Sequence, residues 1–167
     1  MLLQTPSRAR LGHIMAKVYV LVGVPGSGKS TWVSNQDWAK DCVYISSDRH
    51  IEDEAQRQGK TYNEVFKDYA TTAVSMMLDD VVAAREAGKD IIWDQTSVNV
   101  KSRRKKFSML PDYYHIAVVF ATPSPEEHAR RLDRPGKHIP KDVLDSMIKN
   151  FEMPTEEEGF KEIWRAA

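Results

Sequence analysis

The stretch Gly23-Val24-Pro25-Gly26-Ser27-Gly28-Lys29-Ser30, directly after the apolar run 18–22, decides the fold of this chain. A short apolar run predicts a buried strand, and the glycines after it let the backbone curl until successive N–H groups point at one anion. A lysine at the end of such a loop reaches the β- and γ-phosphates of a nucleoside triphosphate, and the next hydroxyl can ligate Mg²⁺. The sequence therefore predicts that the phosphates are bound by Gly23, Gly26, Ser27, Gly28, Lys29, Ser30 and Thr31, with Ser30 on Mg²⁺.

The length and composition indicate one domain without a strong overall charge. The 167 residues suit a single α/β domain, and Lys plus Arg equals Asp plus Glu at 24 each. A nucleic acid would therefore have to be bound by a local basic patch. The only cysteine, Cys42, excludes an internal disulfide framework and favours a reducing compartment. No apolar run approaches the ~20 residues of a membrane span and no secretion signal is visible, so we expect a cytoplasmic protein with no membrane partner.

Short apolar runs alternate with stretches that can form helices. The runs fall at 18–22, 42–45, 90–93 and 115–121. This alternation is typical of an α/β protein with a central parallel sheet flanked by helices. Residues 1–14 show no sustained period, so we expect a flexible leader or expression-vector remnant there, followed by one folded domain over 15–167. An acidic stretch ending near Trp164 is expected to close the domain.

Local signals predict where the later helices begin and end. Apolar residues keep helical spacing over 62–88, where a glycine provides a stop. Ser124 followed by Pro125 is a strong helix start. Two prolines and a glycine exclude a regular helix over 134–140, so we expect an exposed cationic loop there, and then a last helix over about 141–151.

Asp48 is the best candidate for a general base. It lies just beyond the second apolar run, and open parallel sheets bind their ligands at the carboxyl ends of strands. A carboxylate there could accept the proton of an acceptor hydroxyl during phosphoryl transfer. The spacing equally allows Asp48 to cap a helix that begins near Arg49, and it does not separate the two roles.

Two further positions suit the donor side of such a reaction. Asp94 ends the third run and would lie near Mg²⁺ or Lys29, in direct contact with the metal or through water. Its alternative role is to cap the turn at 95–96. Arg134 is predicted to be the arginine of a lid, with Arg130 also at the nucleotide, because a guanidinium matches phosphate oxygens that gain charge during transfer.

The densest positive run is Arg103-Arg104-Lys105-Lys106. On a helix these side chains would spread around more than one face. Either they form a solvated face, or some of them face the acceptor and contact a nucleic-acid backbone in a salt-dependent manner. His50, His128 and His138 lack metal-ligand spacing, so no zinc site is expected.

These segments, in this order, resemble the 5′-kinase domain of phage polynucleotide kinases, the T4-like P-loop kinases, over most of residues 17–150. The resemblance is carried by the loop at 23–32, by Ser47-Asp48, by the segment 94–99 with Arg103-Arg104, and by 134–140 before 143–147. It implies adenylate-kinase-like sheet connectivity with a basic lid, ATP as donor and Asp48 as the base. It also implies that Lys29 and Arg134 act on the transferring phosphate and that Asp94 lies beside the nucleotide.

The resemblance implies a DNA or RNA acceptor, most directly the 5′-hydroxyl of a strand, in the host-cell cytoplasm if the chain is phage-encoded. Because the sequence stops where T4-like enzymes continue into a phosphatase domain, we expect no 3′-phosphatase activity. One departure concerns the acceptor: Ile51 stands where those enzymes have an arginine that engages its phosphate. Three alternatives stay open: a DNA kinase acting on the hydroxymethyl group of a modified pyrimidine, which needs an unstacked base; a nucleoside or small-metabolite kinase; and a nucleotide-regulated binding module or ATPase.

Overall fold

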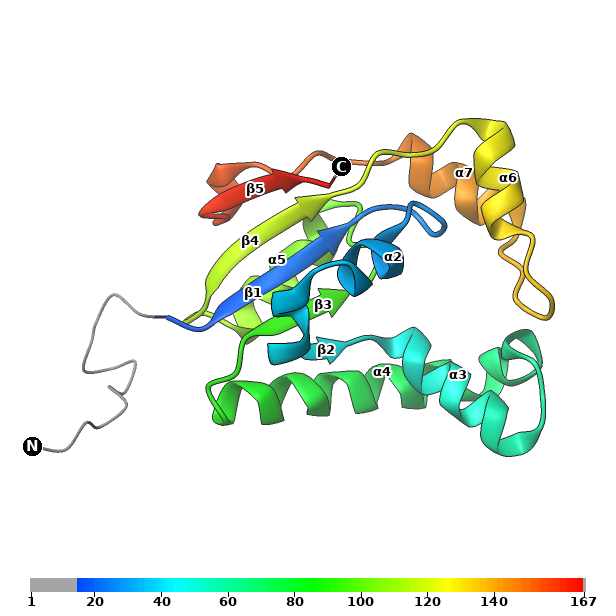
Figure 1. Ribbon diagram of the computed structural model, residues 1–167, viewed down its shortest axis with the longest axis horizontal. Helices are drawn as coiled ribbons and strands as arrows, with labels where there is room; N and C mark the ends of the chain where they lie inside the picture. Colours follow the sequence, from blue (N-terminus) through cyan, green and yellow to red (C-terminus); the bar gives the residue numbers. More distant parts are fainter. Residues whose placement is uncertain (1–14, 167) are drawn as a thin grey trace, which may run out of the picture.

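A parallel sheet forms the centre of the molecule (Figure 1). The computed structural model describes residues 15–166, so the leader predicted at 1–14 lies outside the described residues. Five strands pair in the order β2-β3-β1-β4-β5, and every pairing is parallel. Their bounds are β1 Lys17–Val22, β2 Val43–Ile45, β3 Ile91–Asp94, β4 Tyr114–Val119 and β5 Glu162–Arg165. The predicted α/β class is therefore confirmed, and β1, which carries the glycine loop, is the central strand.

Helices cover both faces of this sheet, with α2 in front of it and α5 behind it in Figure 1. The helical segments are α2 Lys29–Ser34, η1 Asp37–Asp41, α3 Ser47–Gln58, α4 Tyr62–Glu86, α5 Val100–Met109, α6 Pro125–Leu132, α7 Lys141–Lys149 and η2 Glu156–Glu158. The helix predicted up to Gly88 and the start predicted at Ser124 are both confirmed. The last helix ends at Lys149, two residues earlier than expected. Across residues 15–166, no helix combines the length and apolarity needed to cross a membrane.

Alternate residues of β1 pack into two separate apolar layers. Val18, Val20 and Val22 join the core that includes buried residues of α4 and the end of α5. Tyr19 and Leu21 pack on the opposite side, against tryptophans of α2, η1 and β5. Strand β1 is buried on both faces, and exposing either face to water would cost free energy. The strand is therefore held rigidly. The loop that follows it therefore starts from a fixed point.

Side-chain caps begin the helices that surround the end of the sheet. The Ser46 hydroxyl accepts a hydrogen bond from the Arg49 N–H at the start of α3, and Thr61 with Glu64 forms a reciprocal capping box at α4. Asn99 caps α5 in the same way, through the N–H of Ser102. Capping satisfies N–H groups that a first helical turn leaves without partners. These helices therefore begin at defined residues.

The fifth strand was not predicted from the sequence, which indicated only an acidic stretch ending near Trp164. Strand β5 is short, mostly exposed and at the sheet edge, so it lacks the apolar run that marks the other strands. Its anchor is Trp164, whose ring lies 5.6 Å from that of Tyr19 and 6.2 Å from that of Trp38. Contacts of one aromatic residue give no periodic signal in the sequence.

Candidate active site

The glycine loop closes tightly after β1. Gly26 and Gly28 have φ angles of 77° and 96°, a left-handed region that costs glycine little and other residues more. A Cβ at Gly23 would lie 2.6 Å from Ser27 Oγ and 2.9 Å from Phe120 Cβ. Ser27 Oγ itself is buried and has no hydrogen-bond partner among the described residues. The loop is therefore a cradle that needs glycine in its curve and has no room for larger residues, as phosphate binding by main-chain N–H groups requires.

Lys29 at the start of α2 points its ammonium back into this loop. Its Nζ donates hydrogen bonds to the carbonyl oxygen of Gly23 at 2.7 Å and to that of Val24 at 3.4 Å. Burial lowers the pKa of Lys29, while the carboxylates of Asp94 and Asp48 oppose that shift. Gly23 does not line the cleft, and its part in the site is to accept the hydrogen bond from Lys29 with its carbonyl oxygen. The Lys29 ammonium therefore lies within the curve of the glycine loop.

Asp94 lies beside the glycine loop because β3 pairs with β1. The register sets Asp94 opposite Leu21, one residue from the end of β1. Its carboxylate accepts a short hydrogen bond from the Tyr44 hydroxyl of neighbouring β2. Burial raises the pKa of Asp94, and the hydrogen bond from Tyr44 and the charge of Lys29 oppose the rise. The sheet alone thus brings this predicted site residue next to the loop.

Asp48 occupies the first turn of α3, and it does not cap that helix. The cap is Ser46, so the alternative role weighed for Asp48 is wrong. The Asp48 side chain is 55% exposed, and its carboxylate accepts a hydrogen bond from the Tyr62 hydroxyl at 2.6 Å. Its other oxygen lies 3.3 Å from the Lys137 ammonium. Two neighbours thus orient a carboxylate that stays open to the cleft.

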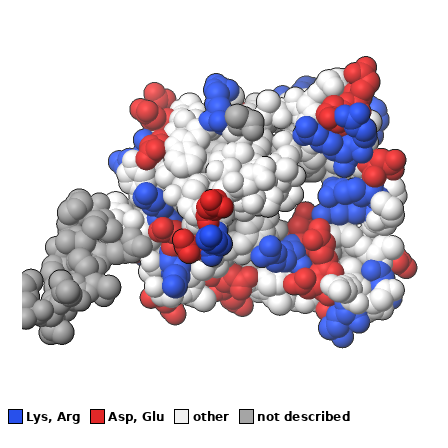
Figure 2. Space-filling model, viewed as in Figure 1, with Lys and Arg blue, Asp and Glu red and all other residues white. Residues whose placement is uncertain are grey.

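The predicted cationic loop over 134–140 forms a lid on this site. Arg134 and Lys137 close a tight turn through an isolated β-bridge, with Gly136 at φ 72°. The turn contacts the start of α4: the Asn63 N–H donates to the carbonyl of Gly136 at 2.9 Å, and the N–H of His138 donates to Asn63 Oδ1 at 2.6 Å. Figure 2 shows the molecule hollowed between the lid region and α3, with basic and acidic side chains around the opening. We call residues 134–138 the lid turn.

One cleft of about 1320 Å³ joins these elements. The predicted residues that line it are Gly26, Ser27, Gly28, Lys29, Ser30, Thr31, Asp48, Asp94 and Arg134. Arg130 does not line it, because its exposed guanidinium pairs with Glu127 on the same helix. Arg131 lines the cleft instead and donates to the Gly26 carbonyl at 3.2 Å. A helix turns about 100° per residue, so the basic pair alone could not show which arginine faces inward.

Two tyrosines of the site were missed by sequence reasoning. Tyr44 reads as one more apolar strand residue, yet its hydroxyl donates to Asp94. Tyr62 reads as the first apolar residue of a long helix, yet its hydroxyl donates to Asp48. Burial raises the pKa of both phenols, so each stays a hydrogen-bond donor. Their pairing with carboxylates depends on contacts distant in sequence, which periodicity does not reveal.

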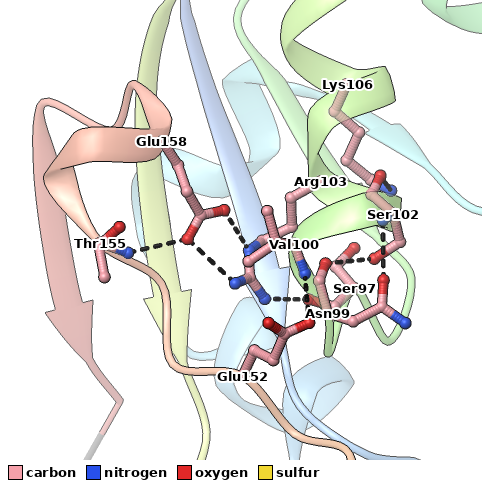
Figure 3. A network of polar contacts seen from close by, with 9 residues as sticks. All are labelled: Ser97, Asn99, Val100, Ser102, Arg103, Lys106, Glu152, Thr155 and Glu158. Atoms are coloured by element: carbon pink, nitrogen blue, oxygen red, sulfur yellow. Dashed lines mark hydrogen bonds and ion pairs between the residues drawn. The ribbon is translucent and has the colours of Figure 1, made fainter.

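The basic run on α5 is divided between surface and interior, because Arg104 and Lys105 are exposed whereas Arg103 is buried. Arg103 is 0% exposed, and its guanidinium donates to both carboxylate oxygens of Glu158, at 2.8 and 3.1 Å (Figure 3). It also donates to the Ser97 carbonyl at 2.8 Å, in the loop that follows Asp94. Lys106 is buried as well, at 4% exposed. The expectation of a solvated face or an acceptor-facing row is therefore wrong for Arg103, which is a structural tie.

Ile51, the residue that departs from the T4-like pattern, points into the protein. It is 2% exposed and packs in the small core shared by α3 and α4. Arg49 lines the cleft instead, and its guanidinium lies 4.2 Å from the centre of the Tyr44 ring. A cationic group thus remains on this wall, one residue after Asp48.

The oxygen groups in the cleft fit a magnesium ion bound with phosphates. Ser30 supplies a hydroxyl and Asp94 a carboxylate, and Mg²⁺ prefers oxygen ligands of this kind together with water and phosphate oxygens. Within residues 15–166, no three His, Cys, Asp or Glu side chains gather as a metal cluster. Ser30 and Asp94 would therefore hold the ion jointly with its nucleotide.

The chain is similar to known proteins in sequence and in fold. The family model described as an AAA domain matches residues 18–154. The bifunctional polynucleotide phosphatase/kinase of Schizosaccharomyces pombe is 26% identical over 153 residues, which cover 88% of this chain and 32% of that protein. The chain thus spans about a third of the length of this curated relative.

Two solved structures share the fold. A protein of Chloroflexus aurantiacus, described as a candidate kinase, superimposes with a TM-score of 0.65 at 14% identity, covering 92% of this chain and 88% of that one. A chain of the Pnkp1/Rnl/Hen1 RNA repair complex superimposes with a TM-score of 0.60 at 24% identity, covering 83% and 44%. At these identities the likeness concerns the fold, which is that of the P-loop kinases.

Proposed function

We propose that this protein, which belongs to the AAA domain family, transfers the terminal phosphoryl group of ATP to a hydroxyl of a nucleic acid, most directly the 5′-hydroxyl of a strand. The observation that carries the proposal is the cleft: a phosphate cradle forms one side, and the Asp48 carboxylate faces the same space from α3. The polynucleotide phosphatase/kinase relative supports the choice of acceptor.

Asp48, Lys29 and Arg134 have separate roles in the proposed phosphoryl transfer. Asp48 accepts the proton of the acceptor hydroxyl while the oxygen of that hydroxyl forms a bond to the γ-phosphorus. The bond between this phosphorus and the β–γ bridging oxygen breaks, which releases ADP. Lys29 and Arg134 offset the charge that grows on the phosphoryl oxygens. When bound, ATP with Mg²⁺ supplies the electrophilic phosphorus. Most of the catalysis is then positioning, which suits a rigid loop opposed by a lid.

The first experiment screens acceptors with radiolabelled ATP. The purified protein is incubated with 5′-hydroxyl oligonucleotides of DNA and RNA, with duplexes containing hydroxymethylpyrimidines, and with free nucleosides. We expect label on the 5′-hydroxyl strands. Label confined to modified duplexes or to nucleosides would replace the acceptor with one of those classes. Hydrolysis of ATP with no labelled acceptor would favour an ATPase or binding module.

The second experiment removes the base. Asp48→Asn should lower kcat by about 10²–10⁴-fold while ATP affinity is mostly kept, because proton transfer is lost and the cradle is untouched. Glu52→Gln is the matched control: Glu52 is 53% exposed, lines the same cleft and also pairs with Lys137, at 2.8 Å. It should stay within about threefold of the unmodified protein. Equal losses in both variants would make the effect one of cleft charge and remove Asp48 from its role.

A further inference from the structure

A second cavity, of about 420 Å³, lies between α4 and α5. One wall is apolar and consists of Val74, Met77 and Leu78 of α4. The opposite wall is basic and is formed by Lys101, Lys105 and Lys106 of α5. Neither the glycine loop nor the lid turn belongs to its lining. The cavity thus combines an apolar surface with ammonium groups, outside the cleft that holds the predicted donor site.

Lys106 is the unusual group in this cavity. It is 4% exposed, yet none of the ion pairs formed within residues 15–166 involves it. Its ammonium lies 4.9 Å from the centre of the Trp93 ring, and its hydrogen bond to the Ser102 carbonyl is long, at 3.5 Å. A buried ammonium without a carboxylate is costly. An anion in the cavity would remove that cost.

The rest of the basic wall also favours an anion. Lys101 and Lys105 are exposed and line the same cavity, together with Asn99 and Ser102 of the first turn of α5. The start of a ten-residue helix adds a partial positive charge. Burial lowers the pKa of Lys106 to about 8, so its amine remains mostly protonated at neutral pH. Figure 3 shows the Lys106 side chain running back along the helix toward Ser102.

Gln95 connects the two cavities. It follows Asp94 directly and lines both the large cleft and the smaller cavity. Its side-chain oxygen accepts a hydrogen bond from the Trp93 indole at 3.1 Å, which holds it between them. Gln95 therefore marks the place where the two cavities lie on either side of one residue.

We propose that the cavity between α4 and α5 is a phosphate-binding subsite, which takes a phosphodiester of the acceptor strand on Lys106, Lys105 and Lys101. This inference rests on the proposed function. The apolar wall of α4 favours a nucleotide unit over a free ion, because a sugar or base would cover it while the phosphate meets the lysines. Free phosphate shares the same chemistry, so the tests below separate the two sources.

The binding test uses the Trp93 indole as a reporter and needs no catalysis. The indole N–H resonance of the full chain is assigned with Trp93→Phe and followed by nuclear magnetic resonance during titration. Inorganic phosphate and a 5′-hydroxyl hexanucleotide are the two probes. We expect the hexanucleotide to shift the resonance at concentrations at least tenfold below those of inorganic phosphate. A shift by phosphate alone would make the site one for a free anion, and no shift with either probe would overturn the proposal.

The kinetic test compares acceptors of increasing length. Lys106→Met and Lys105→Gln should raise KM for hexanucleotides about three- to tenfold and leave KM for a nucleoside 3′-monophosphate and for ATP unchanged. The dependence of log(kcat/KM) on log salt should become shallower by about 0.7 for each phosphate contact removed. Lys149→Gln on α7, outside the lining, is the matched control and should change neither.

The two tests fail in distinguishable ways. If the unmodified protein phosphorylates no oligonucleotide, the proposed function fails, while the indole titration still reports on strand binding. If phosphorylation by the unmodified protein is normal and the lysine substitutions raise KM equally for short and long acceptors, the proposed subsite is overturned. The proposed kinase reaction is then unaffected. Lys105 is exposed, so the Lys105→Gln result remains interpretable even if Lys106→Met disturbs packing.

Discussion

Two basic segments of this protein look alike in sequence and have opposite surroundings in the structure. In the α5 run over 103–106, Arg103 is buried, and its guanidinium donates hydrogen bonds to Glu158 and to the Ser97 carbonyl. The lid turn keeps Arg134 exposed on the wall of the cleft. Charge density alone therefore does not tell a structural arginine from one that meets a ligand. What separates them is the position of a carboxylate 55 residues further along the chain.

The difference has a physical cause in helix geometry. Successive residues on α5 point in different directions, so one basic run contains two buried positions, 103 and 106, and two exposed ones, 104 and 105. The lid turn contains Pro135 and Gly136, which exclude a regular helix, and its Arg134 and Lys137 line the cleft. Its charges therefore stay in solvent or face the cleft.

Breaking the buried tie should cost stability. Arg103→Met would leave the Glu158 carboxylate buried without its partner and the Ser97 carbonyl without its donor, which should lower the free energy of unfolding by about 3–5 kcal/mol. Guanidinium unfolding followed by circular dichroism measures it. Arg104→Met, at the exposed neighbouring position, should change it by no more than about 0.5 kcal/mol. Similar losses for both would mean that Arg103 is not the tie we describe.

Removing the lid arginine should cost activity and leave stability unchanged. Arg134→Ala should lower the single-turnover rate of phosphoryl transfer about 10²–10³-fold, equivalent to about 2.7–4 kcal/mol, because it removes the charge that we propose offsets the charge of the transferring group. Its free energy of unfolding should stay within about 0.5 kcal/mol. Lys141→Ala, an exposed cation just beyond the lid, is the control and should transfer normally. A normal rate in Arg134→Ala would refute its predicted role.

Much of the fold could be predicted because apolar runs mark four of the strands. The glycine loop and the capping residue Ser124 are local signals, and each gives an element boundary. Strand β5 carried no such signal, because an edge strand half exposed to solvent need not be apolar. The helix predicted to 151 ends earlier, at Lys149, and helix ends are where local patterns are weakest.

The candidate site likewise contains residues that local sequence signals predict and residues whose surroundings depend on tertiary packing. Gly26 through Thr31 follow the end of β1 and Asp94 is the last residue of β3, so the topology alone brings them to one cleft. Whether Arg130 or Arg131 faces the cleft depends on which side of α6 packs against the glycine loop. The sequence of α6 alone does not reveal this orientation. The buried environments of Arg103 and Lys106 arise from Glu158 and Trp93, residues that meet them only through tertiary packing.

Titrating Lys106 should reveal its buried ammonium as a pH dependence of stability. Burial, with the charges of Lys105 and Arg103, lowers its pKa from 10.5 to about 8. Between these values the unfolded chain binds more protons, so the unfolding free energy rises with pH, by about 3 kcal/mol over the window. We expect this rise in the unmodified protein relative to Lys106→Met, measured by urea unfolding from pH 7.5 to 10.5. The exposed Lys149→Met, which does not contribute to this pKa, should keep the wild-type slope. A missing difference for Lys106→Met would show that its amine is hydrated.

The smallest expected effect concerns the contact that holds the lid turn. Asn63 forms two side-chain hydrogen bonds with the main chain of His138, donating to its carbonyl at 3.1 Å and accepting from its N–H at 2.6 Å. Asn63→Ala removes both and keeps the main-chain bond from residue 63 to Gly136. Because exposed hydrogen bonds contribute about 0.5–1.5 kcal/mol each, and part of that is recovered by water, lid docking should weaken by about 1 kcal/mol.

That loss should appear locally rather than globally. Amide hydrogen exchange at His138 should accelerate about fivefold, while amides of the buried strand β1 keep their protection, because the lid turn opens without unfolding the sheet. Asn150→Ala is a matched control, since Asn150 bonds only within its own helix end, to Ser146 at 3.1 Å. Faster exchange across the whole sheet would instead mean that the lid turn is part of the cooperative core. The lid turn and the buried α5 run would then contribute to stability in the same way.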